Sequence, residues 1–322
     1  MVRGAMRISV VIPCFNVEAH VDEAVRSIMD QTYEDVDVFA VDDGSTDGTR
    51  ERLQMLTVKY PGRFRWEGGP RNGACAARNL GMARTEGEYV QFLDADDMIL
   101  TDKIHRQVDL IGSSGHPDIV VGDFLNVYED GREELVRGVG TNPWTALIRT
   151  QMGTTSANLF KRSAVEAVGG WNPDQASSQD YELMFRMLKN GSTVAWDPHV
   201  SSLVLKRSSG SISRTDLSAN WKRYIALRQE IRDHLRNTDP ITHAKDIAVG
   251  DQYLFMAIRV LSKHDHTAAL AEFERCMDKS FVPEHSAATT SAYITFYSLF
   301  GFRVAERSAL MMGWLKDRMK LV

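Results

Sequence analysis

The first 120 residues alternate between short apolar runs and segments of helical periodicity, and this alternation restricts the fold more than any other feature. The apolar runs have strand length and lie at residues 7–12, 36–41, 63–66, 89–93 and 118–122. Between them, the spacing of apolar and capping residues predicts helices over 17–31, 45–56, 72–83 and 102–111. Alternating strands and helices form a mostly parallel sheet covered on both faces, so the sequence predicts a Rossmann-like α/β fold.

The pattern changes after Gly131. Residues 140–215 mix short strand-like runs (154–160, 193–198 and 201–206) with one helix predicted from Asp180 to Asn190. From Leu217 onward the apolar spacing is helical throughout. We therefore expect a first domain over 1–215 and a helical C-terminal region over 216–322.

The last segment, 291–322, reads as a basic amphipathic helix. It carries five basic residues and two acidic ones, a net charge of +3 in a chain whose net charge is −5. Such a helix can lie on an anionic membrane surface. Packing on the first domain or on a second subunit is the favoured alternative, because stripes of apolar residues at helical spacing usually belong to a core.

Composition narrows the class of protein. The weak net negative charge argues against a general binder of polyanions. Three scattered cysteines are too few for a disulfide framework or a zinc site, which indicates a reducing compartment. No run approaches the ~20 apolar residues that span a bilayer, and the N-terminus lacks the apolar core of a secretory signal. We expect a cytoplasmic protein, with peripheral membrane contact as an open alternative.

Acidic side chains collect where the predicted strands end. Asp42 and Asp43 follow the second strand, and Asp94, Asp96 and Asp97 follow the fourth. In an open α/β sheet, ligands bind outside the carboxyl ends of the strands. Carboxylates that meet there repel one another unless a cation balances them, so the pattern predicts a Mg²⁺ or Mn²⁺ site that leaves positions for phosphate oxygens.

Each of these residues also has a purely structural interpretation. Acidic turns are common, and Ser45 and Thr46 fit a turn or helix cap. Asp42 is the better ligand contact, because it ends its strand and can accept a hydrogen bond from a base N–H. Arg78, in a helix of small residues, is either a surface ion pair or a contact to a ligand phosphate.

Four ordered segments resemble glycosyltransferase family 2. They are SVVIPCFNVE, VDDGSTDGT, NGACAARNLGMARTEGEYVQFLDADD and GGWNPDQASSQDYELMFRMLKNG, and the resemblance is dense over residues 6–200. It implies an inverting enzyme of GT-A fold that uses a nucleotide-diphosphate sugar, of which UDP-sugars are commonest. The acceptor expected from it is a glycan or lipid-linked glycan in surface polysaccharide synthesis, and the transferase would be of hexosyl or N-acetylhexosaminyl type.

The resemblance assigns roles to matching positions only. Asp180 is the implied catalytic base, and Asp96 is the principal metal ligand, with Asp94 and Asp97 beside it. The implied nucleotide-binding residues are Pro13, Asn16, Glu18, Asp42, Asn72, Gly73, Arg78 and Asp94.

The chain departs from the family in two places. Gln179 precedes the catalytic aspartate where the family more often has Glu. The family's YRxHxGS-like stretch reads LKRSSGSIS, with Ser208 where the histidine would stand, so Lys206, Arg207 and Ser208 become candidate diphosphate contacts.

The remaining predictions concern the acceptor and the competing functions. Trp171 and Asp174 are candidate acceptor contacts from their position, although a buried packing role fits Trp171 equally well. A homo-oligomer is an open prediction. The alternatives to a transferase are a non-catalytic nucleotide-sugar-binding or regulatory protein and a metal-dependent nucleotidyltransferase, although VIPCFNVE lacks the basic, glycine-rich triphosphate loop of the latter.

Overall fold

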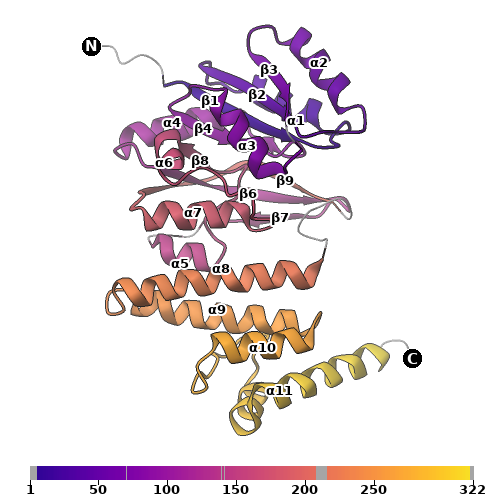
Figure 1. Ribbon diagram of the computed structural model, residues 1–322, viewed down its shortest axis with the longest axis vertical. Coiled ribbons are helices and arrows are strands. Elements are labelled where there is room, and N and C mark those ends of the chain that lie inside the picture. Colours follow the sequence, from indigo (N-terminus) through magenta and orange to yellow (C-terminus); the bar gives the residue numbers. More distant parts are fainter. Residues whose placement is uncertain (1–5, 70, 139, 141, 208–215, 320–322) are drawn as a thin grey trace. The chain divides into compact units, whose positions relative to one another are not determined.

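The computed structural model describes residues 6–69, 71–138, 140, 142–207 and 216–319. The chain divides into two compact units, Met1–Gly210 and Ser211–Val322. The first unit carries the sheet and the second is helical (Figure 1).

The first unit is an α/β unit in which helices and strands alternate along the chain. Its strands are β1 Ile8–Cys14, β2 Val36–Asp42, β3 Phe64–Gly68, β4 Tyr89–Phe92, β5 Met98–Ile99, β6 Ile119–Tyr128, β7 Glu133–Val136, β8 Leu159–Lys161 and β9 Val194–Lys206. Its helices are α1 Val21–Met29, α2 Thr49–Lys59, α3 Ala74–Ala83, α4 Lys103–Ser113, α5 Pro143–Ile148, α6 Arg162–Ala167 and α7 Gln179–Lys189.

Among the described residues these strands form one sheet in the order β3-β2-β1-β4-β8-β6-β9-β5, with β7 paired to β6. β1 pairs in parallel with β2 on one side and β4 on the other, and β2 pairs in parallel with β3. β1 is nearly fully buried. This agrees with its unbroken apolar run, because a strand covered on both faces has no exposed positions for polar side chains. The predicted parallel arrangement is therefore confirmed for the first four strands.

The second half of the sheet is mixed, because β9 pairs in parallel with β6 whereas the short strands β5, β7 and β8 pair antiparallel with their neighbours. The three-residue strand β8 lies between β4 and β6 and runs antiparallel to both. Apolar periodicity shows that a segment is a strand, but it does not show which distant strand becomes its neighbour. The position of β8 between β4 and β6 therefore comes from the structure and not from the sequence pattern.

The two strand-like runs at 193–198 and 201–206 are one strand, β9. Its register against β6 shifts after Gly122, which pairs with Asp197, so that Asp123 pairs with Val200. Pro198 lies in this irregularity, where the lack of a backbone N–H is tolerated. The strand therefore continues through the proline with a shifted register.

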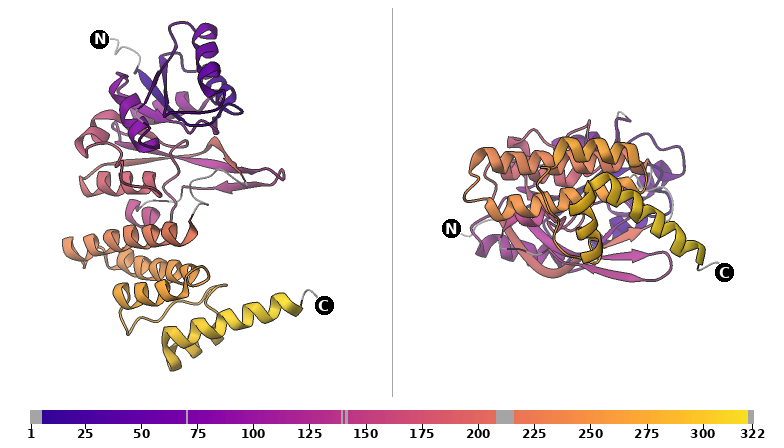
Figure 2. Two further views of the ribbon diagram at one scale, coloured as in Figure 1. Left: turned by 45° about the vertical axis from the view of Figure 1, so that its right-hand side comes forward. Right: turned by 90° about the horizontal axis from the view of Figure 1, so that it is seen from below.

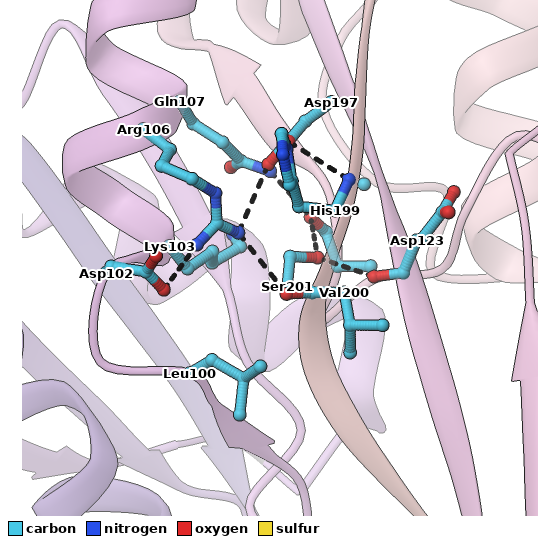
Figure 3. Close-up of polar contacts among 12 residues, drawn as sticks. Leu100, Asp102, Lys103, Arg106, Gln107, Asp123, Asp197, His199, Val200 and Ser201 are labelled. Carbon is cyan, nitrogen blue, oxygen red and sulfur yellow. Dashed lines mark hydrogen bonds and ion pairs between the residues drawn. The ribbon is translucent and has the colours of Figure 1, made fainter.

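A polar cluster around the buried Asp197 ties α4 to this irregularity of β9 (Figure 3). Arg106 of α4 forms ion pairs with Asp102 and with the buried Asp197, and its Nη2 atom also donates to the Val200 carbonyl at 3.2 Å. His199 Nδ1 lies 2.8 Å from the Asp197 carboxylate. Asp197 is the buried charge of the cluster, and a buried carboxylate is stable only when it is paired, so its contacts with Arg106 and His199 fix α4 against β9.

The second unit consists of α8 Leu217–Thr238, α9 Ala244–Ser262, α10 His266–Cys276 and α11 Ser291–Met319. Figure 2 shows it from two further directions. Phe255 is central to its core, with ring contacts to Phe273, Tyr297 and Phe302. In the part of the chain that the structure describes, no helix combines the length and apolarity needed to cross a membrane.

Candidate active site

The predicted site residues gather at one edge of the sheet because β2, β1 and β4 are neighbours. Asp42, the last residue of β2, pairs in register with Cys14, the last residue of β1. Pro13 stands one residue earlier, opposite Val41. Asp94 follows β4 by two residues, so the carboxyl ends of three adjacent parallel strands present these side chains together.

The loops after β1 and β2 hold each other in place. Asn16, in the left-handed region with a φ of 52°, donates its backbone N–H to Ser45 Oγ at 3.0 Å. Its side-chain Oδ1 accepts from the Thr46 N–H at 2.8 Å. Glu18 Oε2 accepts from the Gly48 N–H at 2.9 Å. Ser45 therefore does not begin a helix as expected: α2 starts at Thr49, and Ser45 joins the two loops.

Asp42 lies beneath these loops with no exposed side-chain surface. Its carboxylate accepts from Arg50 Nε at 2.5 Å and from the Ser45 N–H at 3.0 Å. Burial opposes ionisation, but the hydrogen bonds from Ser45 and Arg50 outweigh it and lower the pKa of Asp42. Asp42 is thus ionised and held in place, and a nucleotide base would have to share it with Arg50.

Asp43 was predicted from the sequence only as an acidic residue of the turn after the second strand, without a role of its own. Its two carboxylate oxygens accept from the backbone N–H groups of Asn72 at 3.1 Å and Gly73 at 2.7 Å. Gly73 has a φ of 86°, which favours glycine, and caps α3. Asp43 therefore fixes the segment that was predicted to close over the nucleotide. The sequence feature that could have indicated this role is its position directly after Asp42.

Arg78 connects three parts of the site. This buried side chain of α3 donates from Nη2 to Asp94 Oδ1 at 2.6 Å and from Nη1 to Gln179 Oε1 at 2.9 Å. Its guanidinium lies 4.5 Å from the centre of the Trp171 ring. Neither a lone surface ion pair nor a free phosphate contact describes this geometry: Arg78 joins the acidic turn after β4 to the start of α7.

The acidic turn contains carboxylates in two different environments. Asp97 is buried, with Oδ2 accepting from Ser156 Oγ at 2.6 Å and Oδ1 from the Leu205 N–H at 3.0 Å. Both of its oxygens hold β9 and residue 156 to the turn, so we no longer count Asp97 among the metal ligands. Asp94 and Asp96 are more exposed, with side-chain exposures of 37% and 19%.

Ser156 is in turn held by a buried amide. Gln91 of β4 donates from Nε2 to the Ser156 carbonyl at 3.1 Å, and its Oε1 accepts from the fully buried Lys103 ammonium. Burial disfavours the charged form of Lys103 and lowers its pKa to about 7. A continuous chain of buried hydrogen bonds therefore supports the acidic turn from inside the protein.

Asp96 forms an ion pair with Arg207, whose Nη2 lies 2.5 Å from Asp96 Oδ2. Burial and the charge of Asp94 raise the pKa of Asp96, while Arg207 opposes the rise. The positive charge beside Asp96 in this structure is thus a guanidinium, contributed by the residue after β9.

The donor set of Asp94 and Asp96 fits a hard divalent cation. Within the described ranges, no group of three or more His, Cys, Asp or Glu side chains is arranged to hold a metal ion. Mg²⁺ and Mn²⁺ sites for phosphate substrates, however, often use one or two carboxylates, with phosphate oxygens and water completing the shell. The mutual repulsion of Asp94 and Asp96, offset here by Arg207, is the property that such a cation would relieve.

Asp180 is the second residue of α7, next to the Gln179 that Arg78 holds. Its Oδ1 accepts from the Tyr181 N–H at 3.0 Å. Burial and the charge of Asp94 raise its pKa, while the Tyr181 hydrogen bond and Arg78 oppose the rise. The effect of the Asp94 charge on Asp180 indicates that the predicted base lies near the predicted metal site. A raised pKa suits a carboxylate that must accept a proton.

The other candidate residues are less central. Trp171 is 1% exposed and packs edge-on against Phe92, so its packing role stands and we do not retain it as an acceptor contact. Asp174 is exposed in the loop before α7. Lys206 ends β9 opposite Tyr128 of β6, and Ser208 lies outside the described residues.

Comparison with known sequences agrees with the geometry. The family model for glycosyl transferase family 2 matches residues 9–166. An uncharacterized glycosyltransferase of Haemophilus influenzae is 26% identical over 226 residues, which cover 69% of this chain and 88% of that protein. TuaG of Bacillus subtilis, a putative teichuronic acid biosynthesis glycosyltransferase, is 37% identical over 105 residues, or 32% of this chain and 41% of that protein.

Solved structures show the same fold. The structure of S. aureus TarS 1-349 in complex with UDP-GlcNAc has a TM-score of 0.66 at 17% identity and covers 95% of this chain and 92% of its own. The mannosyltransferase PcManGT from Pyrobaculum calidifontis, in complex with GDP-Man and Mn²⁺, has a TM-score of 0.59 at 18% identity and covers 96% and 85%. The GT-A fold and the helices that follow it are thereby confirmed.

Proposed function

Because this chain belongs to glycosyltransferase family 2, we propose that it is an inverting transferase that moves a sugar from a UDP-sugar to a hydroxyl of a glycan or lipid-linked glycan. The observation that carries the proposal is the Arg78 bridge, which links Asp94 of the acidic turn to the residue beside Asp180. One side chain thus contacts a candidate donor-binding carboxylate and the neighbour of a candidate base.

The donor is proposed to lie across the carboxyl ends of β1, β2 and β4. Asp42 would accept from the base, and the Asn72–Gly73 segment, held by Asp43, would cover the nucleotide. Arg207 and Lys206 follow from the end of β9 as candidate diphosphate contacts. Support for a UDP-sugar comes from the bound UDP-GlcNAc of TarS. PcManGT is in complex with GDP-Man, so the choice between uracil and guanine is left to experiment.

Transfer would proceed by one displacement at the anomeric carbon. The Asp180 carboxylate takes the proton of the acceptor hydroxyl, whose oxygen forms the new bond to that carbon. The bond from the carbon to the diphosphate oxygen breaks, and the nucleoside diphosphate leaves with the electron pair. A Mn²⁺ or Mg²⁺ ion held by Asp94 and Asp96 would act as a Lewis acid that neutralises charge on the diphosphate.

Arg78 would position both halves of this site without touching the reacting atoms. Its hydrogen bond to Asp94 orients a candidate metal ligand, and its bond to Gln179 fixes the first turn of α7. Asp174, exposed just before α7, remains a proposed acceptor contact. The name of TuaG supports a cell-envelope polymer as acceptor. We further propose that the enzyme works at the cytoplasmic side, uses a hexosyl or N-acetylhexosaminyl donor and forms a homo-oligomer.

A thermal-shift screen of UDP-, GDP- and dTDP-sugars with Mn²⁺ or Mg²⁺, followed by product analysis with the labelled donor that binds, tests this function. A ligand that binds only the folded state raises the melting temperature. Slow release of nucleoside diphosphate is the expected chemistry. Release of pyrophosphate would identify a nucleotidyltransferase, and binding without turnover on any acceptor would identify a non-catalytic nucleotide-sugar binder.

A further inference from the structure

Helix α11 exposes apolar side chains that the helical core of its unit does not use. The helix is bent at Gly301, which has a φ of 75°. Before the bend, Tyr297 is buried and donates to the Phe281 carbonyl at 2.8 Å. Leu299 and Phe300 are 70% and 55% exposed in the same turn. This turn therefore carries apolar side chains in addition to the one that packs in the core.

The exposed side chains form one group with Phe296. The Phe296 and Phe300 rings pack on each other with centroids 4.7 Å apart, one helical turn from each other. Phe296 is 36% exposed, so the pair is covered only on one side. Large apolar side chains gathered in this way on a surface mark an interaction site, whereas single exposed ones do not.

The second half of α11 has the same two-sided character. Phe302 and Ala305 are buried. Val304 and Met311, seven residues apart and therefore on one helical face, are 41% and 67% exposed. Arg307 lies between them on that face and is exposed.

The charge of this surface is positive because its one acid points inward. Glu306 is the only acidic residue between 291 and 311, and it is 2% exposed. It accepts from Arg259 Nε and from the Tyr293 hydroxyl, each at 2.6 Å. Arg303 is 67% exposed and has only a 3.9 Å pair with Glu274. Arg303 and Arg307 therefore give the exposed surface of α11 its charge.

We propose that the exposed side chains on the two sides of the α11 bend, Phe296, Leu299 and Phe300 before it and Arg303, Val304, Arg307 and Met311 after it, dock on an anionic lipid bilayer surface. Aromatic and aliphatic side chains interleaved with arginines match the acyl–headgroup boundary, where apolar groups insert and cations meet lipid phosphates. A soluble polyanion would account for the arginines but not for the exposed apolar side chains. A symmetric dimer through these side chains would bring the four arginines of two copies into one interface.

This inference does not rest on the transferase chemistry, since the residues lie in the second unit and none belongs to the proposed active site. The sequence of 291–322 left membrane contact open as an alternative, and the inference names the side chains that would make this contact. Docking should strengthen with the fraction of anionic lipid and weaken with salt, because the electrostatic part is screened.

The test is co-sedimentation of the full chain with vesicles of phosphatidylcholine alone and of phosphatidylcholine mixed equally with phosphatidylglycerol. Neither vesicle contains an acceptor glycan, so the result is independent of activity. We expect binding to the anionic vesicles only. The charge reversals Arg303→Glu and Arg307→Glu together should reduce it by at least about tenfold, since each basic residue near such a surface contributes about fivefold.

Matched variants separate docking from misfolding. Leu299→Asp should abolish sedimentation with anionic vesicles, whereas Ile241→Asp, at an 89% exposed position of the same unit, should not. Lys279→Glu is the corresponding charge control. All variants should keep the melting temperature and the nucleotide-sugar hydrolysis of the parent. Equal binding to both vesicles, equal loss in the controls, or a lipid-free dimer that Leu299→Asp dissociates would overturn the proposal.

Discussion

The Arg78 guanidinium donates to the Asp94 carboxylate at 2.6 Å while a second nitrogen of the same group, Nη1, bonds Gln179 at 2.9 Å. These two contacts join residues that are 85 positions apart in the sequence. The relationship makes the position of the candidate base depend on the same side chain as the position of the candidate metal ligand.

Arg78→Lys should therefore impair turnover although the charge is kept. A lysine ammonium lacks the planar fork that serves two acceptors at fixed angles. Loss of one charge-assisted hydrogen bond predicts a fall in kcat/KM of about ten- to a hundredfold. Steady-state kinetics measure this, with Arg84→Lys, at a surface ion pair with Glu67, as the control that should be neutral.

Asp180→Asn should abolish sugar transfer and leave nucleotide affinity almost intact. Asparagine keeps the size of the side chain and can still accept from Tyr181 N–H, but it cannot accept the acceptor's proton. General base catalysis contributes about 10²- to 10⁴-fold, which is the expected loss in kcat. Asp109→Asn, on the exposed side of α4, is the matched control, and comparable turnover in the Asp180 variant would remove that residue from the role.

Gln179→Glu should move the acidic limb of the pH profile of kcat to higher pH. Asp180 works as a base only when ionised, and burial together with Asp94 already raises its pKa. The negative charge of a glutamate beside Asp180 raises that pKa further. The glutamate also pairs with Arg78 and so reduces the effect by which the Arg78 charge favours ionisation of Asp180. An unchanged profile, or a shift to lower pH, would show that the residue titrating in this limb is not Asp180.

Arg207→Gln should affect free metal and nucleotide sugar in opposite directions. Removing the guanidinium from Asp96 leaves the carboxylate available, so Mn²⁺ should bind more tightly in the absence of nucleotide. Affinity for the nucleotide sugar should fall, because the proposed diphosphate contact is lost. Calorimetric titration of each ligand measures both effects, with the exposed Arg132→Gln as control. Weaker metal binding in the Arg207 variant would argue against a shared position on Asp96.

Much of the first half of the fold follows from the sequence alone. The runs of β1, β2 and β4 are buried on both faces, and for such strands an unbroken apolar pattern is nearly sufficient. The neighbourhood of Asp42 and Asp94 then follows from the rule that parallel strands end at one edge of the sheet. The insertion of β8 between β4 and β6 does not follow, because its three residues carry no periodic pattern.

The candidate site was predictable in its residue types more than in its contacts. Asp42, Asp94, Asp96 and Asp180 were each indicated by a strand end or a motif. The engagement of Asp97 with Ser156 and Leu205 was not, because these partners are 59 and 108 residues away in the sequence. Long-range partners of this kind decide whether a carboxylate is a ligand or a support, and no local pattern encodes them.

The anomeric configuration of the product, followed by proton NMR during reaction with the nucleotide sugar that binds, tests the central claim most directly. A single displacement assisted by Asp180 predicts that an α-linked donor gives a β-linked product, together with one nucleoside diphosphate per sugar transferred. A product with the donor's own α configuration would contradict the account, because retention requires a different arrangement of reacting groups from the one proposed around Asp180 and Asp96.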